Sequence, residues 1–153
     1  MKEPSQRVKD ILANMSIEQK AAQLSCVIPS LVLEKGEFKE ERALKEMPFG
    51  VGRMTQFASG FTQGPVQAAT GYNAIQKYMI EKTGLPAIIQ NESSSGTVAA
   101  QGTIFPVPIA LASSFEPKLS YEMGKVIADE GKAIGVHAMM SPVADVSRDA
   151  RWG

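Results

Sequence analysis

Short apolar runs alternate with longer amphipathic segments along most of this chain, and this order constrains its fold more than any other feature. The runs at 49–54, 87–89 and 136–146 have the length and composition of buried strands. The segments at 65–83 and 117–134 place apolar residues at helical spacing between these runs. Alternation of this kind favours an α/β fold with a parallel sheet and right-handed crossovers.

The beginning of the chain has a different pattern. Ser16 and Gln19 form a capping box at the start of a short helix with apolar residues on one face. The run at 34–46 is highly charged and is predicted to be a solvated helix or loop. We therefore divide the chain into a helical lead-in at 1–46 and the first βα units at 47–153.

Composition argues against several classes of function. The 153 residues carry sixteen basic and sixteen acidic side chains, a balance that does not favour binding to nucleic acid or to an anionic membrane. With one cysteine and one histidine, we expect no disulfide framework and no metal site, and we expect no cofactor. The first residues lack the apolar region of a signal peptide, and no apolar stretch approaches the roughly 20 residues that span a bilayer. The expected location is the cytoplasm.

Simple structural roles account for several residues that could suggest chemistry. Cys26 is predicted to be a small core residue, and His137 a buried neutral histidine that donates one hydrogen bond. Gly50 and Gly52 lack the third glycine of a dinucleotide-binding loop, so that motif is rejected. The serines at 93–95 have neither a Gly-x-Ser-x-Gly elbow nor a plausible base, so serine hydrolase chemistry is rejected too.

Polar side chains follow each predicted strand. In parallel α/β folds, ligands bind at the carboxyl edge of the sheet because the loops that leave the strands converge there. The third strand leads into 148–153, where two arginines, an aspartate and a tryptophan lie close together in sequence. Charged groups can bind hydroxyls and an indole face can stack, so this cluster suits a polyhydroxylated ligand. The polar residues at the three strand ends are Arg53 with Gln56, Asn91 with Glu92, and Asp145 with Arg148.

Four stretches, in this order and spacing, carry a family resemblance. They are Met15-Ser16-Ile17-Glu18-Gln19-Lys20, Pro86-Ala87-Ile88-Ile89-Gln90-Asn91-Glu92, the stretch from Thr103-Ile104-Phe105-Pro106 to Ser113-Ser114-Phe115, and Ser141-Pro142-Val143-Ala144-Asp145-Val146-Ser147-Arg148-Asp149-Ala150-Arg151-Trp152-Gly153. Together they resemble the N-terminal barrel domain of glycoside hydrolase family 3, which includes β-glucosidases, β-xylosidases and related exo-acting enzymes. The resemblance implies the N-terminal part of a TIM-type (β/α)₈ barrel, incomplete, with about three strands present.

The resemblance also implies the chemistry of a retaining glycosidase. Such an enzyme needs one carboxyl group that attacks the anomeric carbon and another that protonates the leaving oxygen. In the family these groups come from regions that would lie beyond Gly153, so no catalytic residue is assigned here and the chain alone is expected to be inactive. The expected substrate is a β-linked oligosaccharide or glycoside.

Binding and supporting roles within this chain follow from the same resemblance. Glu92 matches the acidic residue of the family that accepts hydrogen bonds from distal sugar hydroxyls. Arg148 matches an arginine of the family that also binds the sugar. Asp149 and Arg151 are expected to brace their loop through ion pairing. Asp145 is expected to cap this loop or to pair with either arginine.

Other interpretations stay open. Ser95 departs from the family pattern, since relatives often have a histidine there. Glu92 taken by itself could be a solvated loop carboxylate, and a pairing of Glu92 with Asp145 as a catalytic dyad is disfavoured. The runner-up function is a non-catalytic sugar-binding or structural half-domain completed by another chain. Because a partial barrel leaves strand edges unpaired, we expect the free chain to self-associate by aggregation or oligomerisation, or to be only marginally folded.

Overall fold

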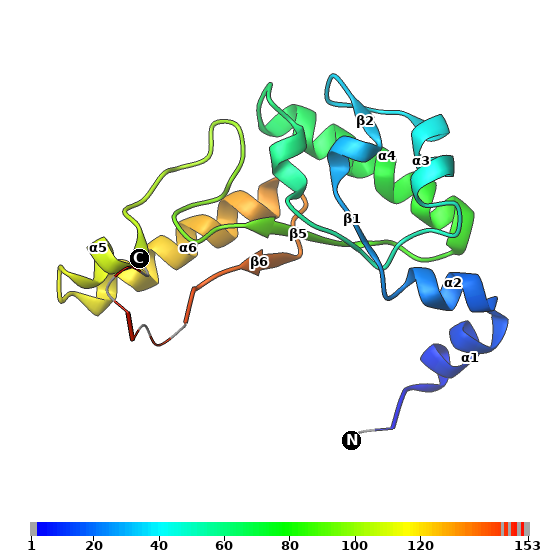
Figure 1. Cartoon of the computed structure of the whole chain (residues 1–153), viewed down its shortest axis with the longest axis horizontal. Coiled ribbons are helices and arrows are strands. Elements are labelled where there is room, and N and C mark those ends of the chain that lie inside the picture. The colour runs from blue at the N-terminus through cyan, green and yellow to red at the C-terminus, as the bar shows by residue number, and fades with distance from the viewer. Residues whose placement is uncertain (1–2, 145, 147, 150, 152–153) are drawn as a thin grey trace.

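The structure is a computed structural model that describes residues 3–144, 146, 148–149 and 151. Its main sheet has four parallel strands in the order β1-β4-β5-β6, and α4 and α6 lie in the crossovers between the last three (Figure 1). In chain order the elements are α1 (Gln6–Asn14), α2 (Ile17–Ala22), β1 (Cys26–Val27), the 3₁₀ turn η1 (Pro29–Leu31), β2 (Leu33–Glu34), β3 (Glu37–Phe38), α3 (Glu40–Glu46), β4 (Arg53–Met54), the 3₁₀ turn η2 (Phe57–Gly60), α4 (Pro65–Thr83), β5 (Ile88–Glu92), α5 (Pro108–Ala112), α6 (Pro117–Ala133) and β6 (Ala138–Met140).

The predicted α/β architecture is confirmed. The three predicted strands correspond to β4, β5 and β6, and β1 adds a fourth strand to the same sheet. The prediction of a strand at 136–146 was too long, since β6 ends at Met140 and Pro142 has no N–H to donate to a ladder. Within the described residues, β1 and β6 each pair with one neighbour only, so this part of the chain forms an open arc of sheet rather than a closed barrel.

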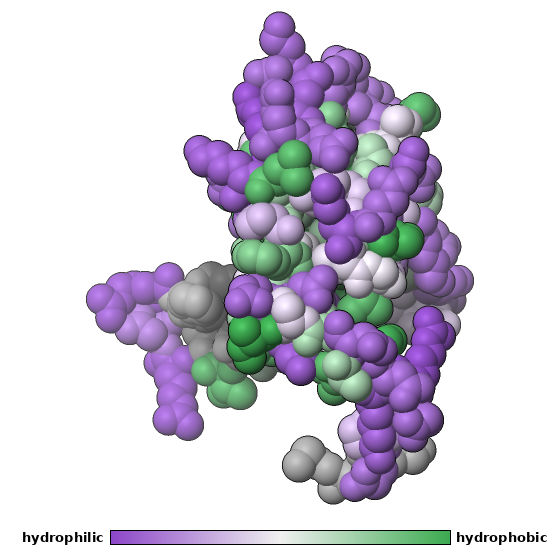
Figure 2. Space-filling view, turned by 90° about the vertical axis from the view of Figure 1, so that its right-hand side faces the viewer, coloured by the Kyte–Doolittle hydropathy of each residue, from purple (hydrophilic) through white to green (hydrophobic). Residues whose placement is uncertain are grey.

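The lead-in at 1–46 was predicted to be helical, but it contains strands as well as helices. The capping box is present, because the Ser16 side chain accepts from the Gln19 N–H and the Gln19 side chain accepts from the Ser16 N–H. The antiparallel hairpin of β2 and β3 and the two-residue strand β1 also lie in this segment. Both α1 and α2 lie at the N-terminal end of the chain and bury none of their residues (Figure 1). Hydrophilic side chains dominate the face shown in Figure 2, with smaller hydrophobic areas between them.

The main hydrophobic core lies between the sheet and α4. Met54 and Ile89 are register partners on neighbouring strands, and both are fully buried. They belong to one cluster with Ile75 and Met79 of α4, which are also fully buried. Burial of each side chain of this size contributes about 1.5–3 kcal/mol. This core fixes the position of β5, whose carboxyl end carries the candidate site.

The glycines before β4 have a structural explanation. A Cβ at Gly52 would lie 1.8 Å from the carbonyl oxygen of Gln23, so only glycine lets β4 pass this close to the end of α2. Gly50 has a φ of +81°, a conformation that side chains with a Cβ rarely adopt. Close packing and backbone conformation therefore account for the glycine pair that resembled part of a dinucleotide loop.

The face of the sheet opposite to Met54 and Ile89, here called the inner face, is open to solvent. Ile88 and Met140 are 47% and 45% exposed on it. The prediction that Cys26 is a core residue is wrong, because Cys26 is exposed in β1 beside Arg53. The prediction that His137 is buried is also wrong, because His137 is exposed just before β6. A strand with one open face leaves alternate residues uncovered, which accounts for the exposure of Cys26, since Cys26 shares the open face with Arg53.

Candidate functional site

Glu92 lies at the carboxyl end of β5, where the sequence pattern placed a ligand-binding residue. It is half-buried, and its register partner on β6 is Met140. Its carbonyl oxygen accepts hydrogen bonds from the Val98 N–H at 3.0 Å and from Nδ2 of Asn91 at 3.2 Å. Its carboxylate forms no hydrogen bond or ion pair within the part of the chain that the structure describes. The backbone of Glu92 is thus held in place while the carboxylate remains available.

A row of polar side chains lies along the inner face beneath Glu92. Nη1 of Arg53 donates to Oε1 of Gln90 at 2.9 Å, and Nε2 of Gln90 reaches Oγ1 of Thr55 at 3.4 Å. Gln90 precedes Glu92 by two residues, so both side chains share one face of β5. The predicted polar residue Gln56, by contrast, is exposed in a left-handed conformation at the start of η2. Sequence reasoning missed the Arg53–Gln90 pair.

Asn91 is in the core rather than at the surface of the site. It has no exposed area, and its side chain bridges three segments. Oδ1 accepts from the Ala58 N–H at 3.0 Å, and Nδ2 donates to the carbonyl oxygens of Glu92 and Val98, each at 3.2 Å. The amide therefore joins η2, the end of β5 and the following loop.

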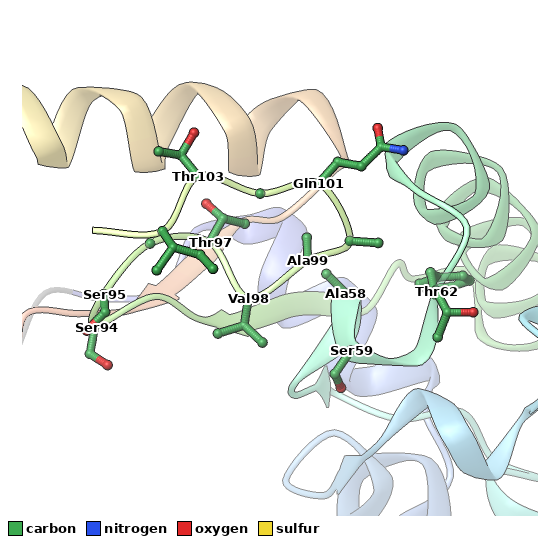
Figure 3. Close-up of a pocket in the computed structure, with 15 residues that line it drawn as sticks. Ala58, Ser59, Thr62, Ser94, Ser95, Thr97, Val98, Ala99, Gln101 and Thr103 are labelled. Carbon is green, nitrogen blue, oxygen red and sulfur yellow. The ribbon is translucent and has the colours of Figure 1, made fainter. Parts of the chain in front are cut away.

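The loop at 94–104 forms one wall of a cavity of about 650 Å³ at this edge of the sheet. Figure 3 shows η2 on the opposite side of this cavity, with the Ala58 side chain pointing toward the loop, and α6 running past Thr97 and Thr103. Ser95, the residue that departs from the family pattern, is one of the lining residues.

Two residues of this loop, Thr97 and Thr103, form hydrogen bonds with α6. Thr97 donates from Oγ1 to the carbonyl oxygen of Ile127 at 3.3 Å. The Thr103 N–H lies 3.2 Å from each carboxylate oxygen of Glu130, and the Thr103 hydroxyl donates to the same carboxylate. A loop anchored at both ends keeps the cavity wall in a defined position.

The C-terminal cluster lies on exposed chain. Arg148 is exposed, and no hydrogen bond or ion pair joins it to Glu92, although both residues belong to the described part of the chain. Arg151 forms an ion pair with Asp149, and its backbone N–H also donates to Oδ1 of Asp149 at 2.9 Å. The Arg151 side chain first, and this N–H second, lower the pKa of the Asp149 carboxyl to about 2. Asp145, expected to support this loop, lies outside the described residues, as does Trp152.

Neither a cluster of metal-ligating side chains nor a membrane-spanning helix is found among the residues that the structure describes. No group of three or more histidine, cysteine, aspartate or glutamate side chains among them could hold a metal ion. Their helices are also too short or too polar to cross a membrane.

Comparison with known proteins decides the family. Residues 16–153 match the model of the glycosyl hydrolase family 3 N-terminal domain. The chain belongs to glycoside hydrolase family 3. The open sheet of parallel strands with helical crossovers is therefore the N-terminal part of the TIM-type barrel of this family.

Individual relatives agree with this assignment. A putative β-xylosidase from Formosa agariphila is 34% identical over 97% of this chain and 20% of its own length. A β-glucosidase structure from Erythrobacter marinus superposes with a TM-score of 0.82 and 26% identity, over 95% of this chain and 19% of that one. A β-glucosidase from Listeria innocua in complex with glucose gives a TM-score of 0.71 and 26% identity, over 99% of this chain and 20% of that one. The chain thus spans about a fifth of the length of these three relatives.

Proposed function

We propose that this chain is part of a retaining exo-β-glycosidase that removes terminal glucose or xylose from β-linked oligosaccharides or glycosides. In this proposal Glu92 and Arg148 bind the sugar, with Asp145, Asp149 and Arg151 supporting the loop around Arg148. The nucleophile and the acid/base are supplied by residues outside this chain, as family membership implies. The observation that carries the proposal is the carboxylate of Glu92, which stands at the carboxyl edge of the sheet without a partner among the described residues.

The chemistry of Glu92 suits binding better than nucleophilic attack. A retaining mechanism needs two carboxyl groups about 5–5.5 Å apart across the scissile bond. A single ionised carboxylate beside a polar row instead offers acceptor oxygens to sugar hydroxyls. Hydrogen bonds of this charge-assisted kind contribute about 1.5–3 kcal/mol each once water is excluded.

Hydrolysis of aryl β-glucoside and aryl β-xyloside tests this proposal. A longer protein that contains this chain should hydrolyse at least one of them, and the 153-residue chain alone should hydrolyse neither. Glu92→Gln should lower kcat/KM of the longer protein, whereas Glu81→Gln, an exposed acid on α4, should not. Absence of turnover on both substrates by the longer protein would refute the proposal.

A second candidate function is a non-catalytic sugar-binding or structural half-domain that another chain completes. The solvent-open inner face and the two edge strands favour it, since both offer surface for a partner. Titration of the chain with glucose and xylose, together with measurement of its association state, distinguishes a sugar-binding half-domain from a purely structural one. Sugar binding or stable assembly without any hydrolytic activity in the longer protein would favour this second candidate.

A further inference from the structure

We propose that Asn91 is a positioning residue, whose buried side-chain amide fixes the backbone of Glu92 so that its carboxylate faces the sugar. This inference rests on the proposed function, because it assumes that Glu92 contacts the substrate. It adds a residue that touches no ligand and acts only through Glu92.

The hydrogen bonds of Asn91 define one orientation of its amide. Oδ1 accepts from the Ala58 N–H at 3.0 Å, and both hydrogens of Nδ2 are directed at carbonyl oxygens, those of Glu92 and Val98. A flipped amide would turn a donor toward the Ala58 N–H and an acceptor toward two carbonyls, losing all three bonds. Because Asn91 is fully buried, no water compensates for such a loss.

The same bonds restrict the peptide that follows Glu92. A carbonyl oxygen has two lone pairs, and here one accepts from Nδ2 of Asn91 and the other from the Val98 N–H. The plane of this peptide is therefore set from two directions. Since consecutive side chains of a strand point to opposite faces, holding Asn91 in the core also directs Glu92 toward the inner face.

A second buried amide at the other end of β5 supplies a matched control. Gln76 of α4 donates from Nε2 to the Ala87 carbonyl at 2.8 Å and accepts at Oε1 from the Ala87 N–H at 2.9 Å. It is 7% exposed and holds the amino end of β5, away from Glu92. Gln76→Glu and Asn91→Asp are equivalent changes, because each keeps the acceptor oxygen and removes the donor.

The experiment uses heteronuclear NMR of the 153-residue chain and of these two variants, each kept below the concentration at which the wild-type chain self-associates. Three-bond couplings report the first side-chain torsion of Glu92 without any ligand, and titration with glucose and xylose reports affinity. We expect one rotamer of Glu92 in the wild type and in Gln76→Glu, and averaging over rotamers in Asn91→Asp. We expect sugar affinity to fall about tenfold in Asn91→Asp and to stay unchanged in Gln76→Glu. In metal sites, removing the hydrogen-bond partner of a ligating side chain lowers metal affinity by about tenfold to a hundredfold, and we expect an effect at the lower end of this range.

The outcomes distinguish this inference from the proposed function. Equal couplings and equal affinities in both variants would overturn the positioning role. A Glu92 torsion that responds only to Asn91→Asp, with no sugar response in the wild type, would support positioning and count against sugar binding. If Asn91→Asp fails to fold, amide hydrogen exchange in the wild type tests the positioning role instead. Protection of the Ala58 N–H, which donates to Oδ1 of Asn91, supports this role, and rapid exchange of that N–H overturns it.

Discussion

Ile89 and His137 form two hydrogen bonds with each other, one through the backbone and one through the imidazole ring. The Ile89 N–H donates to Nδ1 of His137 at 3.0 Å, and the His137 N–H donates to the carbonyl oxygen of Ile89 at 2.9 Å. Since Nδ1 accepts, the neutral ring carries its proton on Nε2, which lies 3.3 Å from the hydroxyl of Tyr72. His137 thus closes the β5–β6 ladder at its amino end.

The imidazole of His137 should therefore matter to stability although it is exposed. His137→Ala leaves the buried Ile89 N–H without an acceptor and should lower the free energy of unfolding by about 1–3 kcal/mol. Chemical denaturation measures this change. Tyr72→Phe removes only the longer contact and should cost less; equal losses in the two variants would contradict the role given to Nδ1.

Much of the fold could be predicted from local chemistry. The capping box of Ser16 and Gln19 and the helix at 65–83 were both predicted, because capping and helical spacing are decided by neighbouring residues. The two residues of β1 could not be predicted, since periodicity needs a longer run. Leu24 was predicted to lie on the apolar face of the helix that begins after Ser16, but α2 ends at Ala22 and Leu24 is 92% exposed.

The candidate site was only partly predictable for a different reason. The strand-end rule and the family resemblance both pointed to Glu92. Asn91 was grouped with it as a polar residue at the strand end, but one position along a strand reverses the face, and Asn91 is in the core. The Arg53–Gln90 contact joins residues 37 positions apart and depends on the register between β4 and β5. No local pattern encodes that register.

Glu130 should stabilise the loop that lines the cavity. Glu130→Ala removes the acceptor of the Thr103 N–H and hydroxyl, and should lower the free energy of unfolding by about 1 kcal/mol, less than for a fully buried charged acceptor. Amide exchange at Thr103 should accelerate in the same variant. Asp129→Ala, the neighbouring exposed acid on α6, serves as the control. Unchanged Thr103 exchange in Glu130→Ala would argue against the anchor.

The ion pair of Asp149 and Arg151 predicts a specific titration. The pKa of the Asp149 carboxyl is about 2 in the folded chain, below its ordinary value, chiefly because of the Arg151 side chain. Because folding lowers this pKa, the contribution of the ion pair to stability is present at neutral pH. It is lost as the pH falls through about 2. Both side chains are exposed, so the stability of the whole chain should change little.

Carbon NMR of the carboxyl group measures this titration directly. Arg151→Gln should raise the Asp149 midpoint toward its ordinary value, whereas Arg148→Gln should not. A midpoint that is ordinary in the wild type would show that the pair does not persist in solution.

The open sheet predicts self-association of the free chain. Ile88 and Met140 are exposed on the inner face, and β1 and β6 are edge strands in the described part of the chain. Met140→Lys places a charge on the edge strand and should weaken association about tenfold, a free-energy change of about 1.4 kcal/mol. Sedimentation equilibrium measures it, with Val66→Lys on exposed α4 surface as the control. A wild-type chain that stays monomeric at high concentration would rule out self-association through the open sheet.

The proposed function depends most directly on a contact between the Glu92 carboxylate and a sugar hydroxyl. A double-mutant cycle measures it, using kcat/KM of a longer protein that contains this chain, with wild-type Glu92 or Glu92→Ala. The substrates are an aryl β-glycoside and its deoxy analogue lacking one distal hydroxyl. A direct hydrogen bond predicts a coupling free energy of about 1.5–3 kcal/mol for at least one hydroxyl. Additive losses at every hydroxyl would contradict the claim that Glu92 binds the sugar.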